Sequence, residues 1–286
     1  MPQLSVIIPC HDNERVLRWS LKSLSASGIP DVEVICVDDA STVDLGPLVQ
    51  SYGAIYVRLP GGSSGRRAMA RNDGHRIAKG RISLYLDGDM IPEPRLIGSA
   101  IRMHQLHSRV AVKYSVYNVP QSNQDSDLSR IGDLILGNRF AELGPSLRRT
   151  AALDTRPLPR RLRGQPTNLW TLCASHCFSI ERRFVDQAGG WDEHFLGWGE
   201  EDLELAYRLH RIGVQFVFPR RKLGAAYHID HHVDWARNLA SLDRNARYFR
   251  DKFPSAWPAR VVLLRAFLRE NNFDDIPVIK DDPKLH

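Results

Sequence analysis

Cysteine is scarce in this 286-residue chain, which excludes a small protein held together by disulfides. The four cysteines are scattered through apolar stretches, at Cys10, Cys36, Cys173 and Cys177. This placement favours buried thiols in a reducing compartment. His176 stands between the last two, but no second Cys/His pair at zinc-ligand spacing lies nearby, so we do not expect a structural zinc site.

Long apolar runs are also missing. None approaches the ~18–20 residues that a membrane-spanning helix needs, and the first apolar run begins at Leu4, which leaves no room for a secretion signal. We therefore expect a soluble, cytoplasmic protein. Hydrophobic residues make up 43% and charged residues 25% of the chain, a globular composition that excludes intrinsic disorder and collagen-like repeats.

Lysine supplies only seven of the 39 cationic side chains, and arginine supplies the other 32. The planar donor fork of arginine suits phosphate groups, although the base composition of a genome also explains such a bias. The net charge of +6 is too small to require a polyanionic partner, and no nucleic-acid-binding motif accompanies it. We therefore expect no nucleic-acid partner.

The first half of the sequence alternates short apolar runs with helical patterns. The runs predict strands and the 3.6-residue periodicity predicts helices, the strands over residues 4–9, 32–37, 54–59 and 82–86 and the helices over residues 13–25 and 66–78. Such alternation indicates a parallel sheet with right-handed crossovers. Ligands bind beyond the carboxyl ends of the strands in such sheets. We expect the polar turns at residues 9–12, 38–41 and 87–89 to meet there.

The second half is less regular. Residues 120–168 are polar and rich in Arg and Pro, which is typical of a mobile loop or lid, and residues 61–65 form a shorter flexible loop. Further strands are predicted over residues 110–119, 172–180 and 214–218, and further helices over residues 201–212, 244–253 and 259–270. Because no repeat or linker is evident, we expect one domain followed by a C-terminal helical appendage.

Asp87-Gly88-Asp89 directly follows a predicted strand. Two carboxylates on either side of a small residue can share one divalent cation, whose shell substrate phosphates often complete. An ordinary acidic turn is the alternative, since Asp and Gly both favour turns. Residues 227–232 contain three histidines, and a neutral imidazole of His228 or His231 suits the same metal. A polar surface loop explains that run equally well.

Three consecutive acids, Glu200, Glu201 and Asp202, follow a Gly-Trp-Gly segment and begin a predicted helix. One carboxylate at a helix start is an ordinary cap, but three exceed what capping needs. Trp191 and Trp198 supply flat apolar faces of the kind that pack against sugar rings. Burial beside tryptophan raises a carboxylate pKa, which suits a general base.

Five motifs of this sequence occur in the order found in glycosyltransferase family 2, which the chain resembles from residue 4 to about residue 232. They are Ser5-Val6-Ile7-Ile8-Pro9, Val37-Asp38-Asp39-Ala40-Ser41, Ala70-Arg71-Asn72-Asp73-Gly74, Leu86-Asp87-Gly88-Asp89 and Gly197-Trp198-Gly199-Glu200-Glu201-Asp202. The resemblance implies an α/β GT-A fold, with a mostly parallel, Rossmann-like sheet flanked by helices. The GT-A domain is expected over residues 1–232, with a nucleotide-binding half over about 1–118 and an acceptor-side half over about 119–232. A C-terminal helical extension follows over residues 233–286.

The resemblance also implies an activity. A family member of this kind is an inverting glycosyltransferase, of the hexosyl- or N-acetylhexosaminyl-transferase type. It moves a sugar from a nucleotide-diphosphate donor, by family preference a UDP-sugar, to a hydroxyl group of a carbohydrate or small-molecule acceptor. It uses a divalent metal ion, Mn²⁺ or Mg²⁺.

By the same resemblance, five residues are expected to bind the donor: Pro9, Asp38, Asp39, Arg71 and Asp87. Pro9 and its turn line the nucleotide pocket, and Asp38 or Asp39 accepts hydrogen bonds from the base or ribose. Arg71 lies near the nucleotide and the diphosphate.

The metal and catalytic residues are matched in the same way. Asp87 and Asp89 match the two acids of the metal motif, with Asp87 also near the donor, and His228 matches a histidine that completes the metal site in some relatives. Asp202 matches the catalytic base and Glu201 positions the acceptor. Relatives often carry Gly in place of Glu200, so the position of the base is open by one residue.

Two other classes of function remain from the residues alone. A nucleotidyltransferase acting on a sugar phosphate uses a similar sheet edge, but it needs no base for an acceptor hydroxyl. A non-catalytic, Arg-rich module would bind nucleic acid or an anionic membrane surface. Arg260, Arg265 and Arg269 share the segment at residues 257–270, most of which is the predicted helix at 259–270, with apolar positions, which suits either peripheral membrane contact or packing on the domain. Donor and acceptor specificity is expected in residues 115–180.

Overall fold

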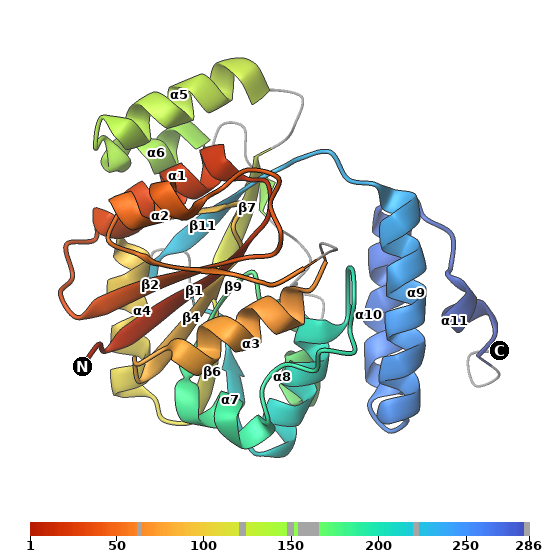
Figure 1. Cartoon of the computed structure of the whole chain (residues 1–286). Helices are drawn as coiled ribbons and strands as arrows, with labels where there is room; N and C mark the ends of the chain where they lie inside the picture. Colours follow the sequence, from red (N-terminus) through yellow and green to blue (C-terminus); the bar gives the residue numbers. More distant parts are fainter. Residues whose placement is uncertain (62–64, 120–123, 148–151, 154–165, 220–222, 283–286) are drawn as a thin grey trace.

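A computed structural model describes residues 1–61, 65–119, 124–147, 152–153, 166–219 and 223–282. A seven-stranded sheet in the order β10-β6-β9-β4-β1-β2-β3 lies at its centre (Figure 1). The strands are β1 (Leu4–Cys10), β2 (Val32–Asp38), β3 (Ile55–Arg58), β4 (Ile82–Leu86), β6 (Val110–Lys113), β9 (Cys177–Glu181) and β10 (Gln215–Val217). Only β9 runs antiparallel to its neighbours, β4 and β6. The predicted mostly parallel sheet is therefore confirmed.

A second sheet of four strands lies beside the first, in the order β5-β11-β7-β8. Its strands are β5 (Met90–Pro92), β7 (Ser115–Val119), β8 (Ala152–Leu153) and β11 (Ala225–Ile229). The single strand predicted over residues 110–119 is wrong, because the chain leaves the large sheet at the buried Tyr114 and continues as β7 in the small one. Strand β11 was not predicted, and it places His228 on a strand rather than in a loop.

Helices cover both faces of the large sheet. The buried leucines of α1 (Glu14–Ser25) share one apolar cluster with buried apolar side chains of α2 (Gly46–Ser51), α4 (Arg95–Leu106) and the sheet. Buried apolar side chains of α3 (Arg67–Ile77), α7 (Arg182–Ala188) and α8 (Glu201–Arg211) belong to the cluster on the other face. In α1, Leu17, Leu21 and Leu24 recur at helical spacing, which places all three on the buried side.

The lid predicted over residues 120–168 is wrong for the part that the structure describes. That part contains α5 (Gln124–Leu136) and α6 (Phe140–Leu147), and the buried residues Leu128, Ile131 and Ile135 share an apolar cluster with Trp19 of α1. Residues 120–123, 148–151 and 154–165 lie outside the described residues, as do residues 62–64 of the predicted loop at 61–65. A 3₁₀ helix (Pro166–Leu172) occupies the start of the strand predicted over residues 172–180, so β9 begins later than expected.

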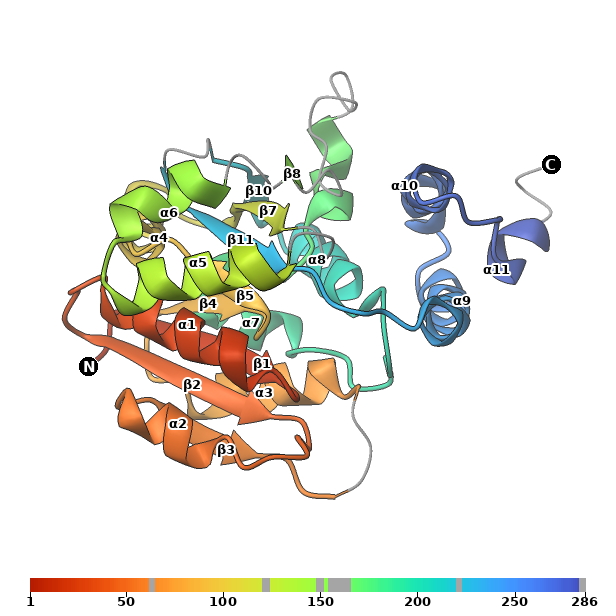
Figure 2. The same ribbon diagram turned by 90° about the horizontal axis from the view of Figure 1, so that it is seen from above.

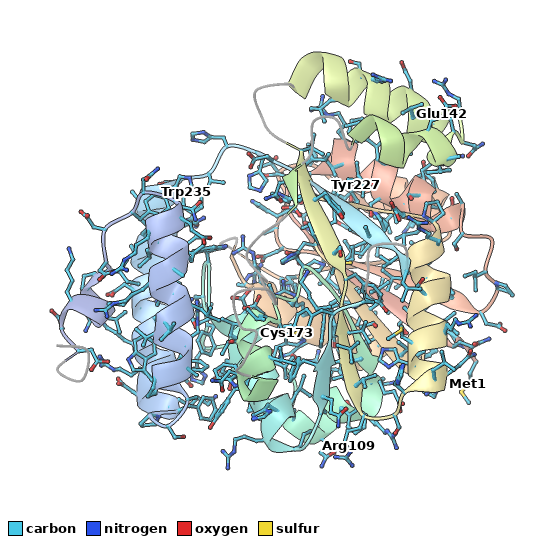
Figure 3. All side chains as sticks on the ribbon, turned by 180° about the vertical axis from the view of Figure 1, so that it is seen from behind. Met1, Arg109, Glu142, Cys173, Tyr227 and Trp235 are labelled. Carbon is cyan, nitrogen blue, oxygen red and sulfur yellow. The ribbon has the colours of Figure 1, made fainter. Side chains whose placement is uncertain are left out.

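Three helices, α9 (Trp235–Lys252), α10 (Trp257–Glu270) and α11 (Pro277–Lys280), form the C-terminal part (Figure 2). Helix α9 begins earlier than predicted, at an N-cap in which the Asp234 carboxylate accepts a hydrogen bond from the backbone N–H of Arg237. Apolar side chains of α9 and α10, among them Phe249 and Leu264, share a core with Leu209 of α8. Side chains of the C-terminal helices and of the sheet-bearing part, including α8, fill the space between the two (Figure 3).

None of the helices in the described ranges combines the length and the apolar character needed to cross a membrane. The apolar side of α10 is covered, because Val261, Leu264 and Leu268 are buried in the core. All four cysteines are buried and unpaired, as predicted, and burial raises the pKa of Cys36 to about 12.

Candidate active site

The carboxyl ends of β1, β2 and β4 meet at one edge of the large sheet, as predicted for three polar turns. Two backbone hydrogen bonds join the turns directly. The N–H of Asp39 donates to the carbonyl of Cys10 (2.8 Å), and the N–H of Gly88 donates to the carbonyl of Pro9 (3.2 Å). Glycine fits position 88 closely, because a Cβ there would lie 3.0 Å from the carbonyl oxygen of Pro9 and would also displace the end of the Asn13 side chain.

Asp38, at the end of β2, is fully buried and its carboxylate already has four hydrogen bonds. One oxygen accepts from the backbone N–H (2.8 Å) and the hydroxyl (2.6 Å) of Ser41, and the other accepts from Tyr56 (2.7 Å) and Arg58 (3.0 Å). Asp38 therefore fixes the turn after β2. A contact with a nucleotide would have to replace one of these bonds.

Asp39 holds the loop that precedes α3. Its carboxylate accepts hydrogen bonds from the backbone N–H groups of Gly65 and Arg66 (both 2.7 Å) and from the Arg66 Nε (2.8 Å). This side chain joins the end of β2 to the start of α3, the helix that carries Arg71.

Arg71 links the Asp-Gly-Asp turn to the start of α8. Its Nη2 donates to Asp87 Oδ1 (2.9 Å), and its Nη1 donates to Glu201 Oε1 (3.2 Å). The guanidinium lies 4.8 Å from the centre of the Trp191 ring, and the side chain is 2% exposed. Burial alone would lower the pKa of Arg71, but the two carboxylates reverse the effect and raise it. Arg71 is therefore a permanent positive charge between two acids far apart in the sequence.

Asp89 forms a compact group with His228 and His231. The Nε2 atoms of the two histidines lie 3.3 and 3.4 Å from Asp89 Oδ2, and one donor atom from each residue lies within 4.8 Å of the others. Burial alone would raise the pKa of Asp89, but the two imidazoles hold it well below its ordinary value. Asp87 is not part of this group, because it contacts Arg71 instead.

This group fits a divalent cation. Asp89 Oδ1 is buried and has no hydrogen-bond partner among the described residues, and the same holds for Nδ1 of His228. A buried carboxylate oxygen without a donor is costly unless something else satisfies it. One carboxylate with two imidazoles is a donor set that suits Mn²⁺ and other divalent transition metals. Both histidines lie next to Asp89, so the geometry does not choose between them as the metal ligand.

Asp202 lies in the first turn of α8, partly buried. Its Oδ2 accepts a hydrogen bond from the backbone N–H of Ser175 (3.1 Å). Among the described residues it forms no ion pair, whereas its neighbour Glu201 is held by Arg71. Burial, with the nearby charge of Glu201, raises the pKa of Asp202 to about 7. A carboxyl group with such a pKa can accept a proton near neutral pH.

The two tryptophans have different surroundings. The interpretation of Trp191 as a face for a sugar ring is wrong, because the residue is 3% exposed and lies under the Arg71 guanidinium. Trp198 is partly exposed and contacts the rings of Trp235 (6.0 Å between centres) and Phe267 (5.6 Å).

A buried pair that the sequence analysis missed lies next to the Asp-Gly-Asp turn. Lys113 Nζ is 2.9 Å from His176 Nε2, and the carbonyl of His176 accepts the backbone N–H of Asp87 (3.2 Å). The available signal was a lysine inside an otherwise apolar strand. Ser175 was also missed, because a backbone donor leaves no trace in the residue type.

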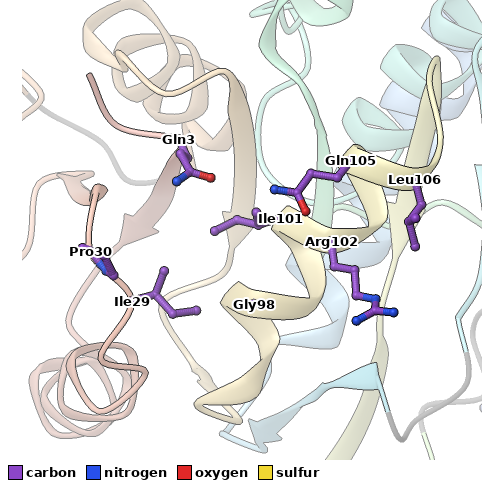
Figure 4. Close-up of a pocket in the computed structure, with 8 residues that line it drawn as sticks. All are labelled: Gln3, Ile29, Pro30, Gly98, Ile101, Arg102, Gln105 and Leu106. Atoms are coloured by element: carbon purple, nitrogen blue, oxygen red, sulfur yellow. The ribbon is translucent and has the colours of Figure 1, made fainter.

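A cavity of about 440 Å³ lies elsewhere, between α4 and the residues that precede β1 and β2 (Figure 4). Its lining includes Gln3, Ile29, Pro30 and Arg102. These residues lie toward the amino ends of the strands, whereas the polar turns lie at the carboxyl ends. The cavity is therefore separate from the acidic edge.

Two family sequence models match the chain. Residues 5–190 match the family described as Glycosyl transferase family 2, and residues 166–232 match the one described as N-terminal domain of galactosyltransferase. The first match covers more than half of the chain and contains four of the five motifs. Residues 233–286 lie outside both.

The chain is similar to several bacterial enzymes. It is 28% identical over 272 residues to the validoxylamine A glucosyltransferase of Streptomyces hygroscopicus subsp. jinggangensis (strain 5008), which covers 90% of this chain and 63% of the relative. It is also 28% identical over 303 residues to the chondroitin synthase of Escherichia coli, covering 94% and 42%. The chain thus spans less than two thirds of the length of these relatives.

Solved structures share the fold. A crystal structure of S. aureus TarS 1-349 in complex with UDP-GlcNAc superposes with a TM-score of 0.68 at 16% identity, covering 100% of this chain and 77% of that one. A complex of the same protein with UDP gives a TM-score of 0.59 at 16% identity, covering 86% and 65%. The likeness agrees with the fold class predicted from the sequence.

Proposed function

The chain belongs to glycosyl transferase family 2, and from this membership we propose that it transfers a sugar from a nucleotide-diphosphate sugar to an acceptor hydroxyl, with inversion at the anomeric carbon. The observation that carries the proposal is the ion-paired connection Asp87–Arg71–Glu201. Through this connection the Asp87-Gly88-Asp89 turn lies close to the start of α8, where Asp202 has a raised pKa. A donor on one side and an acceptor on the other would meet between them.

The donor nucleotide is proposed to lie over the ends of β1 and β2. Pro9 and the turns fixed by Asp38 and Asp39 form the floor of this region, and Arg71 with Asp87 lies on the side of the diphosphate. UDP is the proposed nucleotide, in line with the neighbouring structures that contain UDP and UDP-GlcNAc. The name of the glucosyltransferase relative supports a hexose as the sugar, and the neighbouring complex with UDP-GlcNAc supports an N-acetylhexosamine.

Asp89, His228 and His231 are proposed to hold a divalent cation, Mn²⁺ or Mg²⁺. Such an ion neutralises negative charge on the leaving diphosphate. Arg71 adds a fixed positive charge on the same side, and because both of its partners are carboxylates it stays protonated throughout. Asp87 orients Arg71 by accepting its hydrogen bond, and we place Asp87 itself next to the donor.

Asp202 is proposed as the general base. It would take the proton from the acceptor hydroxyl while that oxygen forms a bond to the anomeric carbon. The bond from this carbon to the diphosphate oxygen breaks, and the diphosphate leaves with the electron pair. A single displacement of this kind inverts the anomeric centre. Glu201, held by Arg71, would fix the first turn of α8 and the acceptor beside it.

The acceptor is proposed to be a hydroxyl group on a carbohydrate or small molecule. The name of one relative couples a glucosyltransferase with the small molecule validoxylamine A, and the name of another couples a synthase with the carbohydrate chondroitin, which supports these two classes of acceptor. This proposal needs no nucleic-acid partner. Contact of the Arg-bearing α10 with a membrane surface remains a separate proposal that anionic liposomes would test.

The experiment is a thermal-shift and transfer assay with UDP, UDP-glucose and UDP-N-acetylglucosamine, with and without Mn²⁺. We expect a nucleotide to raise the melting temperature only when Mn²⁺ is present, because a ligand that binds the native protein stabilises it by mass action. EDTA should abolish transfer, and Mn²⁺ or Mg²⁺ should restore it. Unchanged turnover after exhaustive chelation would remove the metal from the proposal, and the absence of any nucleotide effect would remove the donor.

A further inference from the structure

Glu200 occupies a backbone conformation that side chains rarely adopt. Its φ is 74°, in the left-handed region, and it immediately precedes α8. Glycine adopts this conformation without strain, whereas a residue with a Cβ does not. The chain therefore keeps a strained residue next to the proposed base, and something must hold it there.

Arg260 of α10 holds Glu200. The Arg260 Nε donates to Glu200 Oε2 (2.9 Å) and Oε1 (3.1 Å), and Nη2 donates to Oε1 (2.7 Å). The Glu200 side chain is fully buried and that of Arg260 is 10% exposed. The planar guanidinium matches the carboxylate with two parallel bonds, a geometry that lysine cannot reproduce. Removing either partner would leave an unpaired buried charge.

Helix α9 holds the same loop through different contacts. Nδ2 of Asn245 donates to the carbonyls of Gly199 (2.9 Å), Leu196 (3.1 Å) and Trp198 (3.4 Å). The helix lies directly on the loop glycines, because a Cβ added at Gly199 would lie 2.7 Å from Leu242 Cδ1. The segment before α8 is thus fixed by two helices that lie outside both family matches.

The three acids before and within α8 thereby acquire different partners. Arg260 pairs with Glu200 and Arg71 pairs with Glu201 as well as with Asp87, whereas Asp202 has no ion pair among the residues that the structure describes. Three unpaired carboxylates side by side would repel one another and disturb the first turn of the helix. The two arginines leave Asp202 as the one carboxylate of the three without an ion pair among the described residues, held only by the backbone N–H groups of Ser175 and Leu203.

We propose that Arg260 is a positioning residue, which acts through Glu200 to fix the first turn of α8 and so the place of the Asp202 carboxylate relative to the acceptor. This inference rests on the proposed function for the role of Asp202. It assigns a catalytic consequence to the C-terminal helices.

The test compares Arg260→Met with Arg247→Met, a matched control. Arg247 lies on α9 and pairs with Asp243 and Asp281, away from the loop. Arg260→Lys is a milder variant that keeps the charge, and the double variant Glu200→Gly/Arg260→Met removes both charges and the strain. Transfer kinetics are measured with a UDP-sugar donor. Hydrogen exchange of the backbone amides over residues 196–202 is measured by mass spectrometry, and it needs no activity.

We expect Arg260→Met to lower kcat about 10²-fold, the loss typical of a misplaced reacting group, with the donor KM changed less than about twofold because the donor side is untouched. Exchange over residues 196–202 should accelerate at least about tenfold as the loop loosens. Arg260→Lys should give values of kcat and of the exchange rate between those of Arg260→Met and the unmodified protein. The double variant should recover most of the lost kcat. Arg247→Met should behave like the unmodified protein in both measurements.

A merely structural Arg260 would lower the melting temperature while kcat and exchange over residues 196–202 stayed unchanged, and that result overturns the proposal. If Arg260→Met does not fold, Arg260→Lys and the double variant give the same comparison. Failure of the double variant to recover would also contradict a role exerted through Glu200. Absence of transfer by the unmodified protein would contradict the proposed function instead, while the exchange comparison would still decide whether Arg260 fixes the loop.

Discussion

Three adjacent carboxylates at the start of α8 show how far the surroundings of a residue decide its chemistry. Glu200 pairs with Arg260, Glu201 pairs with Arg71, and Asp202 accepts a hydrogen bond from a backbone N–H. The sequence located the acidic block but left the base open by one position. It could not do more, because the paired arginines stand 60 and 130 residues away along the chain.

Replacing Asp202 by Asn is expected to remove the proton acceptor without changing the donor side. We expect kcat to fall by about 10²–10⁴-fold, the usual contribution of a general base, while UDP still raises the melting temperature. In the unmodified protein, kcat should rise about tenfold per pH unit below pH 7 and level off above it, since the pKa of Asp202 is about 7. Full activity of the Asn variant would refute the assignment.

The raised pKa of Asp202 also predicts a pH dependence of stability. Between about pH 4 and 7 the folded protein keeps the proton on Asp202 while the unfolded chain has lost it, so the free energy of unfolding falls as the pH rises. In the Asn variant this group does not titrate, so its free energy of unfolding does not fall for this reason. Between pH 4 and 7, the free energy of unfolding of the unmodified protein should therefore fall by up to about 4 kcal/mol more than that of the variant. Urea unfolding of both proteins at pH 4, 5.5 and 7.5 measures the difference, and parallel curves would contradict it.

At the scale of single elements, α3 combines two purposes in one motif. Arg71 faces the candidate site, while Gly74, three residues later, packs against β1 and β2. A Cβ at Gly74 would lie 2.5 Å from Ile7 Cγ2 and 3.2 Å from Val37 Cγ2. The same short motif therefore carries a charge for chemistry and a missing side chain for close packing.

Gly74→Ala should destabilise the fold by about 1–3 kcal/mol, as overpacking of a filled core does. Gly98→Ala in α4 is the matched control, because its nearest atom is the flexible end of Ile29 at 3.3 Å. There the higher helix propensity of Ala should leave stability unchanged or raise it by up to about 1 kcal/mol. Urea denaturation measures both. Equal effects at the two positions would show that α3 does not pack as described.

Elements with a clear local pattern could be predicted from the sequence, and elements fixed by distant partners could not. The repeated Leu spacing of α1 gave its bounds to within one residue. By contrast, β7 and β11 pair with each other across about a hundred residues, so nothing local marks Ala225–Ile229 as a strand. The helix α5 was interpreted as a loop, because the surface that its apolar side chains pack on, which includes Trp19 of α1, lies about a hundred residues earlier in the sequence.

At the scale of the whole molecule, the C-terminal helices share a core with the sheet-bearing part. Leu203 and Leu209 of α8 lie in one cluster with Leu242 and Phe249 of α9 and with Leu264 of α10. The expected division into residues 1–232 and 233–286 stays a prediction about the chain's organisation. The packing of the two parts nevertheless makes them dependent on each other.

A chain that ends at residue 232 is therefore expected to lose cooperative unfolding. The buried face of α8 and the Glu200 carboxylate would become exposed, and about 25 cal/mol of stabilisation is lost for each Å² of uncovered apolar surface. Near-ultraviolet circular dichroism during heating measures the transition, with the full chain as reference. A sharp transition at the melting temperature of the full chain would show that the two parts are independent.

The Asp89, His228 and His231 group joins segments from different places in the fold. Asp89 follows β4 of the large sheet, whereas His228 lies on β11 of the small one. A cation bound there would link the two sheets, because its ligands come from both of them, and it would also balance negative charge on the donor. Binding of the metal would then also fix the two sheets relative to each other. Where the ion is scarce in a cell, the contact between the sheets would be looser even before a substrate binds.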